Sequence, residues 1–432
     1  MGTQGAGDCR TRQCPAQTRG LITTDHPLST NDHQRSFHVS TESKKVMVIG
    51  GGIAGLTAAW ELAGLGAEVA LVEKADFLGG HAIQYACKAT DECRQCGACA
   101  VEKMLKNVVN EPAISVHLAT EVTGINKNGN FKVSLKKGDV SKDTAACADG
   151  YTANPAGCTA VKGYSLNNAK FYQADGSLNP ETTGNADALE VDAVVVATGF
   201  NAFDPRIKST YRYDELDNVI SGLDLEKGKR ANGVVLRPSD GQPPKKVAFI
   251  QCVGSRDERL GNLWCSQVCC PYALRTAQSM KHKDPELEIT IFYMDIQNTG
   301  NDFPVFYQQC KDEMTFVRNI PVDMYKTDDD RIRTRFMAAE GSSEAIQEVF
   351  DLVVLSVGIM PSADNAALAE TVGAPLNGDG FFACAEKLNR VTTGQEGVFV
   401  AGTASGPKTI AESIVHAGQS AGEVMKYLGR AS

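Results

Sequence analysis

The chain has 432 residues, of which 42% are hydrophobic, so it is long enough to bury the cores of two packed domains. Its formal net charge of −9 excludes a sequence-independent nucleic-acid binder, because such a protein needs a basic face to neutralise phosphates. No apolar run approaches the roughly 20 residues that span a bilayer, so any membrane contact would have to come through a partner.

The first 44 residues are polar and lack hydrophobic periodicity, and we expect them to form a disordered tail. A transit peptide and a start codon assigned too early are the alternatives for this stretch. The chain has 14 cysteines, which are clustered, and no apolar signal segment precedes the first predicted strand. This pattern favours a reducing cytoplasm, with metal or redox chemistry rather than structural disulfides. Cys9 and Cys14 of the tail have no assigned role.

Ordered structure is predicted to begin with the run KVMVIGGGIAGLTAAWELAGLGAEVALVEK. Its apolar pattern predicts a buried parallel strand at Lys45–Ile49, a helix with small inner residues at Ala54–Leu65, and a second strand at Glu68–Val72. The three elements together make a βαβ unit.

The turn of this unit carries Gly50, Gly52 and Gly55 in a G-x-G-x-x-G pattern, and Glu73 closes the second strand about 20 residues later. The glycines permit a tight turn, close approach to a pyrophosphate and helix–strand packing, while the carboxylate would bind the adenosine ribose. We therefore predict a dinucleotide site, against the alternative of a glycine-rich turn without a ligand. Further candidate residues are Ile53, Ala54 and Lys74, and Gly80 and His81 of the motif LGGH.

Two later segments indicate which dinucleotide binds. Residues 189–200 (LEVDAVVVATGF) and 397–423 (GVFVAGTASGPKTIAESIVHAGQSAGE) resemble two further flavoprotein signatures, and the three motifs together predict FAD. The last motif has Thr403 where the usual pattern has Asp, so a hydrogen bond to the ribityl chain would be missing or made by the hydroxyl. The candidate FAD-binding residues in these segments are Ala197, Thr198, Gly199, Gly402, Thr403, Lys408 and Thr409.

A helix is predicted to start near Thr409, and its positive N-terminus would face the pyrimidine edge of the flavin. There it would stabilise negative charge on the reduced ring. Lys408 would add to this effect; the alternative is a solvated loop lysine.

The predicted fold class is α/β, with an FAD-binding Rossmann-like domain of the disulfide-reductase type and a second, inserted βαβ domain that carries an iron–sulfur site. The inserted domain is indicated by the strand KVAFI, a helix at Tyr272–Lys281 and the strands EITIFYMDI and FDLVVLSVG. The predicted boundaries are a tail at 1–44, the FAD-binding domain at 45–244 with a loop-rich insertion at about 141–188, the inserted domain at 245–361, and a return segment of the FAD-binding domain at 362–432.

Four cysteines, Cys252, Cys265, Cys269 and Cys270, follow the first strand of the inserted domain, where a nicotinamide-binding domain has its glycine-rich turn. The spacing offers four thiolates from one loop and a helix start, which is the ligand set of a [4Fe-4S] cluster. Zinc is a weaker alternative because adjacent cysteines suit a tetrahedral site poorly, and two disulfides are disfavoured in a cytoplasmic chain.

A second group, Cys87, Cys93, Cys96 and Cys99, follows the LGGH motif. C-x2-C-x2-C is a ferredoxin-like ligand run, and the fourth ligand would be Cys87 or a remote thiol such as Cys147 or Cys158. The alternatives are a redox-active dithiol that faces the flavin, and free cysteines at a helix start.

The combination of VIGGGIAGLTAAWELAGLGAEVALVEK, LGGH, QCVGSRDERLGNLWCSQVCCPYAL, TIFYMDI and VFVAGTASGPKTIAESIVHAG resembles the A subunit of heterodisulfide reductase and the A subunit of the quinone-interacting membrane-bound oxidoreductase complex. The resemblance covers roughly residues 45–428. Its most specific element is the CVGSRD…C…CC block, which in that family binds a [4Fe-4S] cluster near the flavin. By position, this role falls on Cys252, Cys265, Cys269 and Cys270.

The resemblance implies an FAD- and [4Fe-4S]-containing electron-transfer subunit of a multi-subunit redox complex in sulfur metabolism. Such a subunit would relay electrons between a membrane-linked, quinone-interacting or heterodisulfide-reductase-like partner and a soluble sulfur enzyme such as adenylylsulfate reductase, on the cytoplasmic side of the membrane. One alternative is a stand-alone NAD(P)H-dependent disulfide reductase that uses Cys93, Cys96 or Cys99. Another is a non-catalytic scaffold with a structural flavin.

Overall fold

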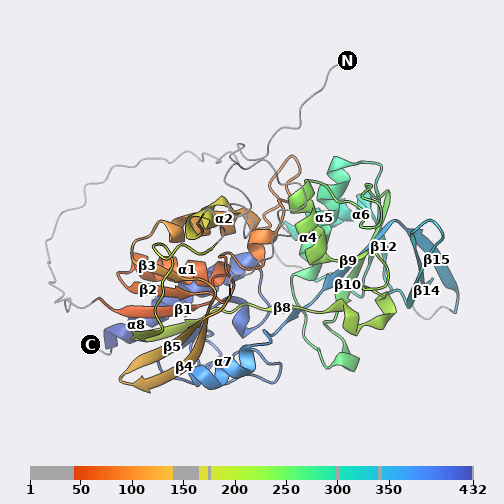
Figure 1. Ribbon diagram of the computed structural model, residues 1–432. Helices are drawn as coiled ribbons and strands as arrows, with labels where there is room; N and C mark the ends of the chain where they lie inside the picture. Colours follow the sequence, from red (N-terminus) through yellow and green to blue (C-terminus); the bar gives the residue numbers. More distant parts are fainter. Residues whose placement is uncertain (1–42, 140–164, 174–176, 298–301, 339–342, 431–432) are drawn as a thin grey trace, which may run out of the picture.

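The computed structural model describes residues 43–139, 165–173, 177–297, 302–338 and 343–430. The predicted tail, including Cys9 and Cys14, lies almost wholly outside these ranges, and so do Cys147, Cys158 and about half of the predicted insertion. The described chain forms two α/β lobes joined by a narrow waist (Figure 1). Within the described ranges, every helix is too short or too polar to cross a membrane.

The first lobe is built on a five-stranded parallel sheet with the strand order β18-β7-β1-β2-β3. Its strands are short runs rich in Val, Ile, Leu and Ala, as expected for a parallel sheet that is covered on both faces. The strand–helix–strand unit predicted at the start of the ordered chain is confirmed. The strands are β1 (Lys45–Ile49), β2 (Glu68–Val72), β3 (Ile114–His117), β7 (Ala193–Val196) and β18 (Val398–Val400).

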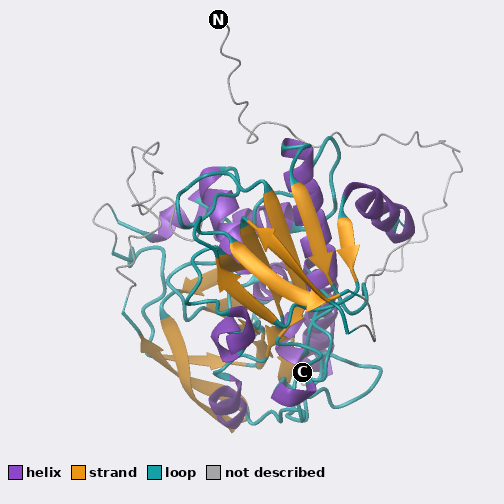
Figure 2. Ribbon diagram, turned by 90° about the vertical axis from the view of Figure 1, so that its right-hand side faces the viewer, coloured by secondary structure: helices purple, strands orange, loops and turns teal. Residues whose placement is uncertain are grey.

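Helices cover one face of this sheet and a small antiparallel sheet covers the other (Figures 1 and 2). The helices α1, α2 and α8 pack on the face that carries Val46 and Val48. The antiparallel strands β5 and β6 pack on the face that carries Met47 and Ile49. The helices are α1 (Ile53–Gly64), α2 (Ala98–Val109), α7 (Asn365–Val372) and α8 (Ile410–Arg430), and the antiparallel strands are β4 (Thr120–Asn128), β5 (Asn130–Lys137) and β6 (Ala188–Val191).

The second lobe repeats this architecture around a parallel sheet with the order β12-β11-β10-β16-β9. The helices α4, α5 and α6 pack on the face of Val247 and Phe249, and the antiparallel strands β13, β14 and β15 pack on the face of Ala248 and Ile250. The elements are β9 (Val219–Ser221), α4 (Gly222–Asn232), β10 (Lys246–Val253), α5 (Cys269–Lys283), β11 (Glu288–Phe292), α6 (Phe303–Glu313), β12 (Thr315–Val317), β13 (Asp323–Lys326), β14 (Ile332–Met337), β15 (Ala345–Phe350) and β16 (Leu352–Val357).

The second lobe begins earlier in the chain than the sequence indicated. We expected the inserted domain to start at Lys245, but β9 already pairs with β16 and extends the second sheet. A three-residue strand carries too little periodicity to be recognised, and its place depends on a partner that is far away in the sequence. The two βαβ-type lobes confirm the predicted α/β class.

Two short antiparallel strands form the waist, β8 (Asn201–Ala202) and β17 (Ile359–Met360). The chain leaves the first lobe through β8, directly after β7, and returns through β17, directly after β16. Figure 1 shows β8 between the two lobes. The covalent connection between the lobes therefore consists of two adjacent strands.

Candidate functional site

A cavity of ≈ 410 Å³ lies between the lobes, at the carboxyl ends of both parallel sheets. Crevices at this edge of an open α/β sheet are the usual ligand sites of such folds. Most residues predicted to bind the dinucleotide line this cavity: Gly50, Gly52, Ile53, Ala54, Glu73, Gly80, His81, Ala197, Thr198, Gly199, Thr403, Lys408 and Thr409.

The turn between β1 and α1 accepts only glycine at two positions. Gly50 has φ +108°, and a Cβ there would lie 2.4 Å from the carbonyl oxygen of Ala197. A Cβ on Gly55 would lie 1.7 Å from the carbonyl oxygen of Gly50, so Gly55 sets the distance between helix and strand rather than lining the cavity. Among the described residues, no side chain caps the N-terminus of α1, so its first N–H groups remain available to an anion such as a pyrophosphate.

Glu73 follows β2 at the cavity wall. Its carboxylate accepts hydrogen bonds from the backbone amides of Gly51 at 2.5 Å and Ala75 at 2.6 Å. Burial raises the pKa of Glu73, and these backbone hydrogen bonds oppose the rise. The next residue, Lys74, does not line the cavity, because its ammonium pairs with Glu121 at 2.8 Å and Asp364 at 3.0 Å.

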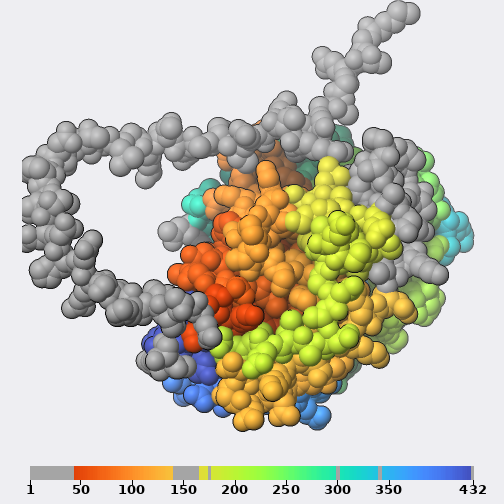
Figure 3. Space-filling model, turned by 60° about the vertical axis from the view of Figure 1, so that its left-hand side comes forward, coloured from red at the N-terminus to blue at the C-terminus, as the bar shows by residue number. Residues whose placement is uncertain are grey.

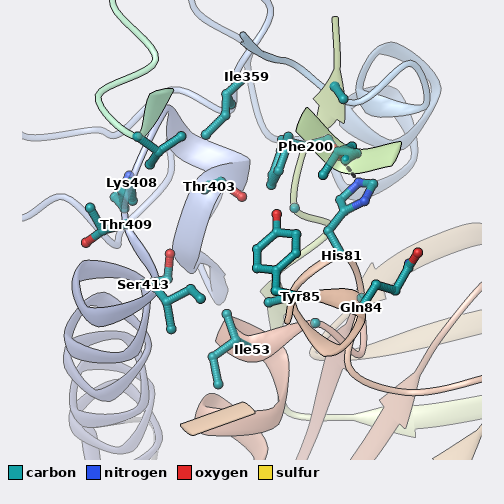
Figure 4. Close-up of a pocket in the computed structure, with 18 of the residues that line it drawn as sticks. Ile53, His81, Gln84, Tyr85, Phe200, Ile359, Thr403, Lys408, Thr409 and Ser413 are labelled. Atoms are coloured by element: carbon teal, nitrogen blue, oxygen red, sulfur yellow. Dashed lines mark hydrogen bonds between the residues drawn. The ribbon is translucent and has the colours of Figure 1, made fainter. Parts of the chain in front are cut away.

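The C-terminal motif places its turn and the start of α8 against the cavity (Figure 4). Gly402 does not line it; its φ is +64° and a Cβ there would lie 2.4 Å from the Cβ of Ala54. Thr409 and Glu412 exchange backbone–side-chain hydrogen bonds at 2.8 and 3.1 Å, which is a capping box at the start of α8. Lys408 lines the cavity, donates to Ser405 Oγ at 2.9 Å, and has its pKa lowered by burial.

Aromatic side chains line the cavity next to the LGGH motif. His81 Nε2 lies 3.0 Å from the carbonyl oxygen of Phe200, and the two rings are 4.8 Å apart (Figure 4). Burial lowers the pKa of His81, so the ring is neutral at neutral pH and donates from Nε2. Tyr85 projects its ring toward the middle of the cavity, between Ile53 and Thr403 (Figure 4).

The second lobe supplies the facing wall. Val268, Pro271, Tyr272 and Arg275 lie at helical spacing along α5 and its entry, so that one face of this helix lines the cavity. The segment Val357–Ile359, at the waist, continues this wall.

The cysteines Cys252, Cys265, Cys269 and Cys270 lie directly behind this wall. Cys252 lies near the end of β10 with φ +58°, and Cys269 and Cys270 open α5. The thiol of Cys269 contacts the carbonyl oxygen of Val357 at 3.6 Å, and Val357 lines the cavity. Burial, followed by the electrostatic influence of the neighbouring cysteines, raises the pKa of Cys269, and burial raises the pKa of Cys270 to about 12.

The second cysteine group lies at the start of α2. Cys96 lines the cavity. Gly97, with φ +80°, precedes the helix, and a Cβ there would lie 2.9 Å from Ile410 Cγ2, so the start of α2 packs on the start of α8. Burial raises the pKa of Cys99, and Cys96 and Cys93 add to the rise.

Neither group has the geometry of a closed metal site. Among the described residues, no three His, Cys, Asp or Glu side chains are placed to hold a metal ion, and the ten described cysteines are free thiols. The donor set nevertheless fits iron–sulfur chemistry, because four thiols gather at each location and influence one another electrostatically.

Some known proteins are similar to this chain in sequence, and others are similar to it in fold. Residues 48–100 match the family of the NAD(P)-binding Rossmann-like domain. The chain is 33% identical over 414 residues to the A subunit of the H(2):CoB-CoM heterodisulfide,ferredoxin reductase of Methanothermobacter marburgensis, a match that covers 86% of this chain and 62% of that protein. It is 32% identical over 420 residues to the iron-sulfur A subunit of the CoB–CoM heterodisulfide reductase of Methanocaldococcus jannaschii, covering 87% of this chain and 63% of that protein.

Over most of its length, the chain is similar to the A subunits of heterodisulfide reductases. The resemblance stated from its motifs is thereby confirmed. The chain spans less than two thirds of the length of these relatives, 62% and 63%. Among solved structures, the thioredoxin reductase of T. acidophilum matches with a TM-score of 0.54 and 15% identity, covering 90% of this chain and 100% of that one. This likeness concerns the fold, and it confirms the disulfide-reductase-type architecture.

Several residues that line the cavity were not found from the sequence. Two of them had a usable signal: Phe200 directly follows the Ala-Thr-Gly motif, and Tyr85 lies shortly after LGGH. Lys88 directly follows Cys87, whereas the residues of the second lobe come from distant segments that only the fold brings to the cavity. The residues missed include Tyr85, Lys88, Phe200, Glu226, Tyr272 and Arg275.

Proposed function

We propose that the chain is an FAD- and iron–sulfur-containing electron-transfer subunit of a multi-subunit redox complex. FAD fits the residues of the cavity: the glycine turn and the uncapped start of α1 suit a pyrophosphate, and Glu73 suits the adenosine ribose. The capped start of α8 and Lys408 offer positive charge to the opposite end of the dinucleotide. When bound, FAD would supply two-electron redox chemistry, and a nearby iron–sulfur cluster would supply single-electron transfer.

Cys252, Cys265, Cys269 and Cys270 would hold a [4Fe-4S] cluster, and Cys87, Cys93, Cys96 and Cys99 a second one. The observation that carries the proposal is the position of both groups against one cavity. Cys96 lies in its wall, and Cys269 contacts the carbonyl of the wall residue Val357. These positions support the proposal that two thiol groups flank one dinucleotide site.

We extend the proposal to the partners. The relatives are named as subunits of heterodisulfide reductases, which supports a multi-subunit assembly for this chain. The finer role is a relay in sulfur metabolism between a membrane-linked, quinone-interacting or heterodisulfide-reductase-like partner and a soluble enzyme such as adenylylsulfate reductase. Co-purification from cells that contain these partners, followed by electron exchange between the isolated components, tests this part.

The stand-alone NAD(P)H-dependent disulfide reductase is the second candidate, and the presence of Cys96 in the cavity wall favours it. Its weakness lies in the second lobe. There the strand β10 is followed by Cys252-Val-Gly-Ser-Arg rather than by a G-x-G-x-x-G turn, so the lobe lacks the backbone cradle for a nicotinamide dinucleotide.

The test is anaerobic purification with quantitation of iron, acid-labile sulfide and FAD, in the wild type and in two cysteine variants. We expect about four irons per FAD from the first group alone, or about eight from both. Cys269→Ser should lose about four irons. Cys310→Ser removes an equally buried thiol outside both groups and should lose none.

An iron-free flavoprotein from strictly anaerobic cells would contradict the iron–sulfur proposal. In that case, oxidation of NADH by the protein and titration of a dithiol among Cys93, Cys96 and Cys99 would support the disulfide reductase. We expect no turnover with NADH alone from the iron-loaded protein.

A further inference from the structure

An ion pair between Lys88 and Glu226 joins the two lobes. Lys88 lies between β2 and α2 of the first lobe, and Glu226 lies in α4 of the second. Both side chains are almost completely buried, with 4% and 5% of their surface exposed. Glu226 also accepts a hydrogen bond from the backbone amide of Ala86 at 2.9 Å, so two donors from the first lobe hold its carboxylate.

Neighbouring residues strengthen this contact between the lobes. The ammonium of Lys88 lies 3.3 Å from the carbonyl oxygen of Ala86 and 5.6 Å from the centre of the Tyr85 ring. From α4, Arg230 donates to the carbonyl oxygen of Tyr85 at 3.1 Å. The backbone of residues 85–88 is therefore fixed to α4 at several points.

The ion pair and the waist are separate attachments around one cavity. Ala202 of β8 and Ile359 of β17 line the cavity at the waist, and Lys88 and Glu226 line it as well. The waist is a pair of two-residue strands, which by itself can act as a hinge. With the ion pair formed, the lobes are held at this buried contact as well as at the waist, and a dinucleotide between them is enclosed. His282 of α5 and Asp91 also approach each other across the lobes, at 3.6 Å, but both side chains are exposed.

Pulling the two charges apart while they remain buried has a high energetic cost. A buried ion pair is stable only while both charges remain paired and hydrogen-bonded, because an unpaired buried charge is strongly unfavourable. Opening must therefore hydrate both groups together. The contact then has two states, one closed and paired and one open and hydrated, without stable intermediates.

We propose that the Lys88–Glu226 ion pair is a clasp that holds the two lobes closed over the dinucleotide, so that its opening governs dinucleotide release and entry. This inference rests on the proposed function in that FAD is the enclosed ligand. Lys88 and Glu226 belong to none of the motifs described above, and the inference gives them a positioning role in retaining the cofactor.

The test is the rate of FAD release from the full-length holoprotein, followed by flavin fluorescence in the presence of a flavin-scavenging apoprotein. Lys88→Met leaves a buried carboxylate unpaired, and Glu226→Gln neutralises the partner while keeping an acceptor for the Ala86 amide. We expect each variant to release FAD roughly tenfold faster or more. The double variant should release it no faster than the faster single variant, because both changes remove the same interaction.

The matched control is Lys45→Met, which breaks an ion pair with Glu68 whose side chains are 58% and 54% exposed. It should leave the release rate unchanged. Unchanged release in both clasp variants, with FAD bound at full occupancy, would overturn the clasp and leave the proposed function standing.

Hydrogen exchange at the amide of Ala86 provides a second readout that needs no flavin. This amide donates to Glu226 across the lobes. It should exchange faster in Lys88→Met than in the wild type, with or without FAD, and equal rates would overturn the clasp. A wild-type chain that binds no FAD but shows the exchange difference would overturn the proposed function and retain the ion pair as the closure between the lobes.

Discussion

The backbone amide of Gly402 donates a hydrogen bond to Nδ1 of His416 at 3.0 Å. Nε2 of the same imidazole donates to the carbonyl oxygen of Arg390, also at 3.0 Å. These partners require a neutral ring with its proton on Nε2, because Nδ1 acts as an acceptor. Burial, with a contribution from Lys408, lowers the pKa of His416 to about 4. His416 thus joins α8 to the turn that precedes it at the cavity.

The two hydrogen bonds of His416 predict that the free energy of unfolding decreases in acid. The pKa of His416 is about 4 in the folded chain and about 6.5 in the unfolded chain, so the unfolded chain binds more protons between these values. The contribution of His416 is present above pH 6.5 and is lost as the pH falls towards 4, by up to about 3 kcal/mol. Urea unfolding between pH 7 and 4.5 should show a smaller loss of unfolding free energy in His416→Gln. Equal losses in the two proteins would contradict the assignment.

The same substitution, glycine to alanine, should have opposite effects at two positions of α1. A Cβ on Gly55 would lie 1.7 Å from the carbonyl oxygen of Gly50, whereas a Cβ on Gly64 would meet no atom of the described residues within 4 Å. Gly55→Ala should force β1 and α1 apart and strongly weaken FAD binding. Gly64→Ala should bind FAD normally and gain about 0.5–1 kcal/mol of stability. FAD titration and thermal unfolding check both outcomes, and normal binding by Gly55→Ala would refute the close-packing argument.

The glycine turn shows what a local pattern can predict. The sequence correctly predicted the strand at Lys45–Ile49, the helix after it and the strand at Glu68–Val72. These predictions succeed because apolar periodicity and glycine spacing depend only on residues that are close together in the sequence. The location of the cysteine groups beside the cavity follows from similarly compact motifs. In these stretches the local preferences and the fold agree.

The clasp shows what such a pattern cannot predict. Ala86 and Glu226 are 140 positions apart, and nothing near either residue indicates the other. Strand β9 presents the same difficulty, since its three residues acquire a place only by pairing with β16. Contacts of this kind depend on how two lobes close on one another, which hydrophobic periodicity does not encode.

The described part of the predicted insertion at residues 165–173 contacts the loop that lines the cavity. Asn168 is fully buried, and its amide exchanges two hydrogen bonds of 3.0 Å with the backbone N–H and C=O of Leu78. Figure 3 shows this yellow segment against the orange residues of the first lobe. Because Leu78 directly precedes Gly79 and Gly80 in the cavity wall, Asn168 fixes the loop that lines the cavity.

Asn168→Ala should therefore loosen this loop. It leaves two buried backbone groups of Leu78 without partners, at a cost of about 1–3 kcal/mol each at most. Hydrogen exchange at Leu78 and Gly79 should accelerate, and FAD affinity should fall. Asn110→Ala, which removes an exposed amide bonded to Lys106, serves as the control and should change neither. Unaltered protection of Leu78 in Asn168→Ala would contradict this role of Asn168.

Replacing Lys408 or Lys74 distinguishes the effect of a positive charge in the cavity wall from that of a positive charge on the surface. Lys408 lies in the cavity wall beside the start of α8, whereas Lys74 lies outside the cavity and is paired with Glu121 and Asp364. If Lys408 stabilises negative charge on the reduced flavin, Lys408→Met should lower the two-electron reduction potential by about 30 mV or more, equivalent to about 1.4 kcal/mol. Lys74→Met removes a positive charge that surface carboxylates already neutralise, and it should leave the potential unchanged. Anaerobic dye-equilibration titrations of both variants provide the measurement. Equal potentials in the wild type and Lys408→Met would assign the stabilisation of negative charge to the helix start alone.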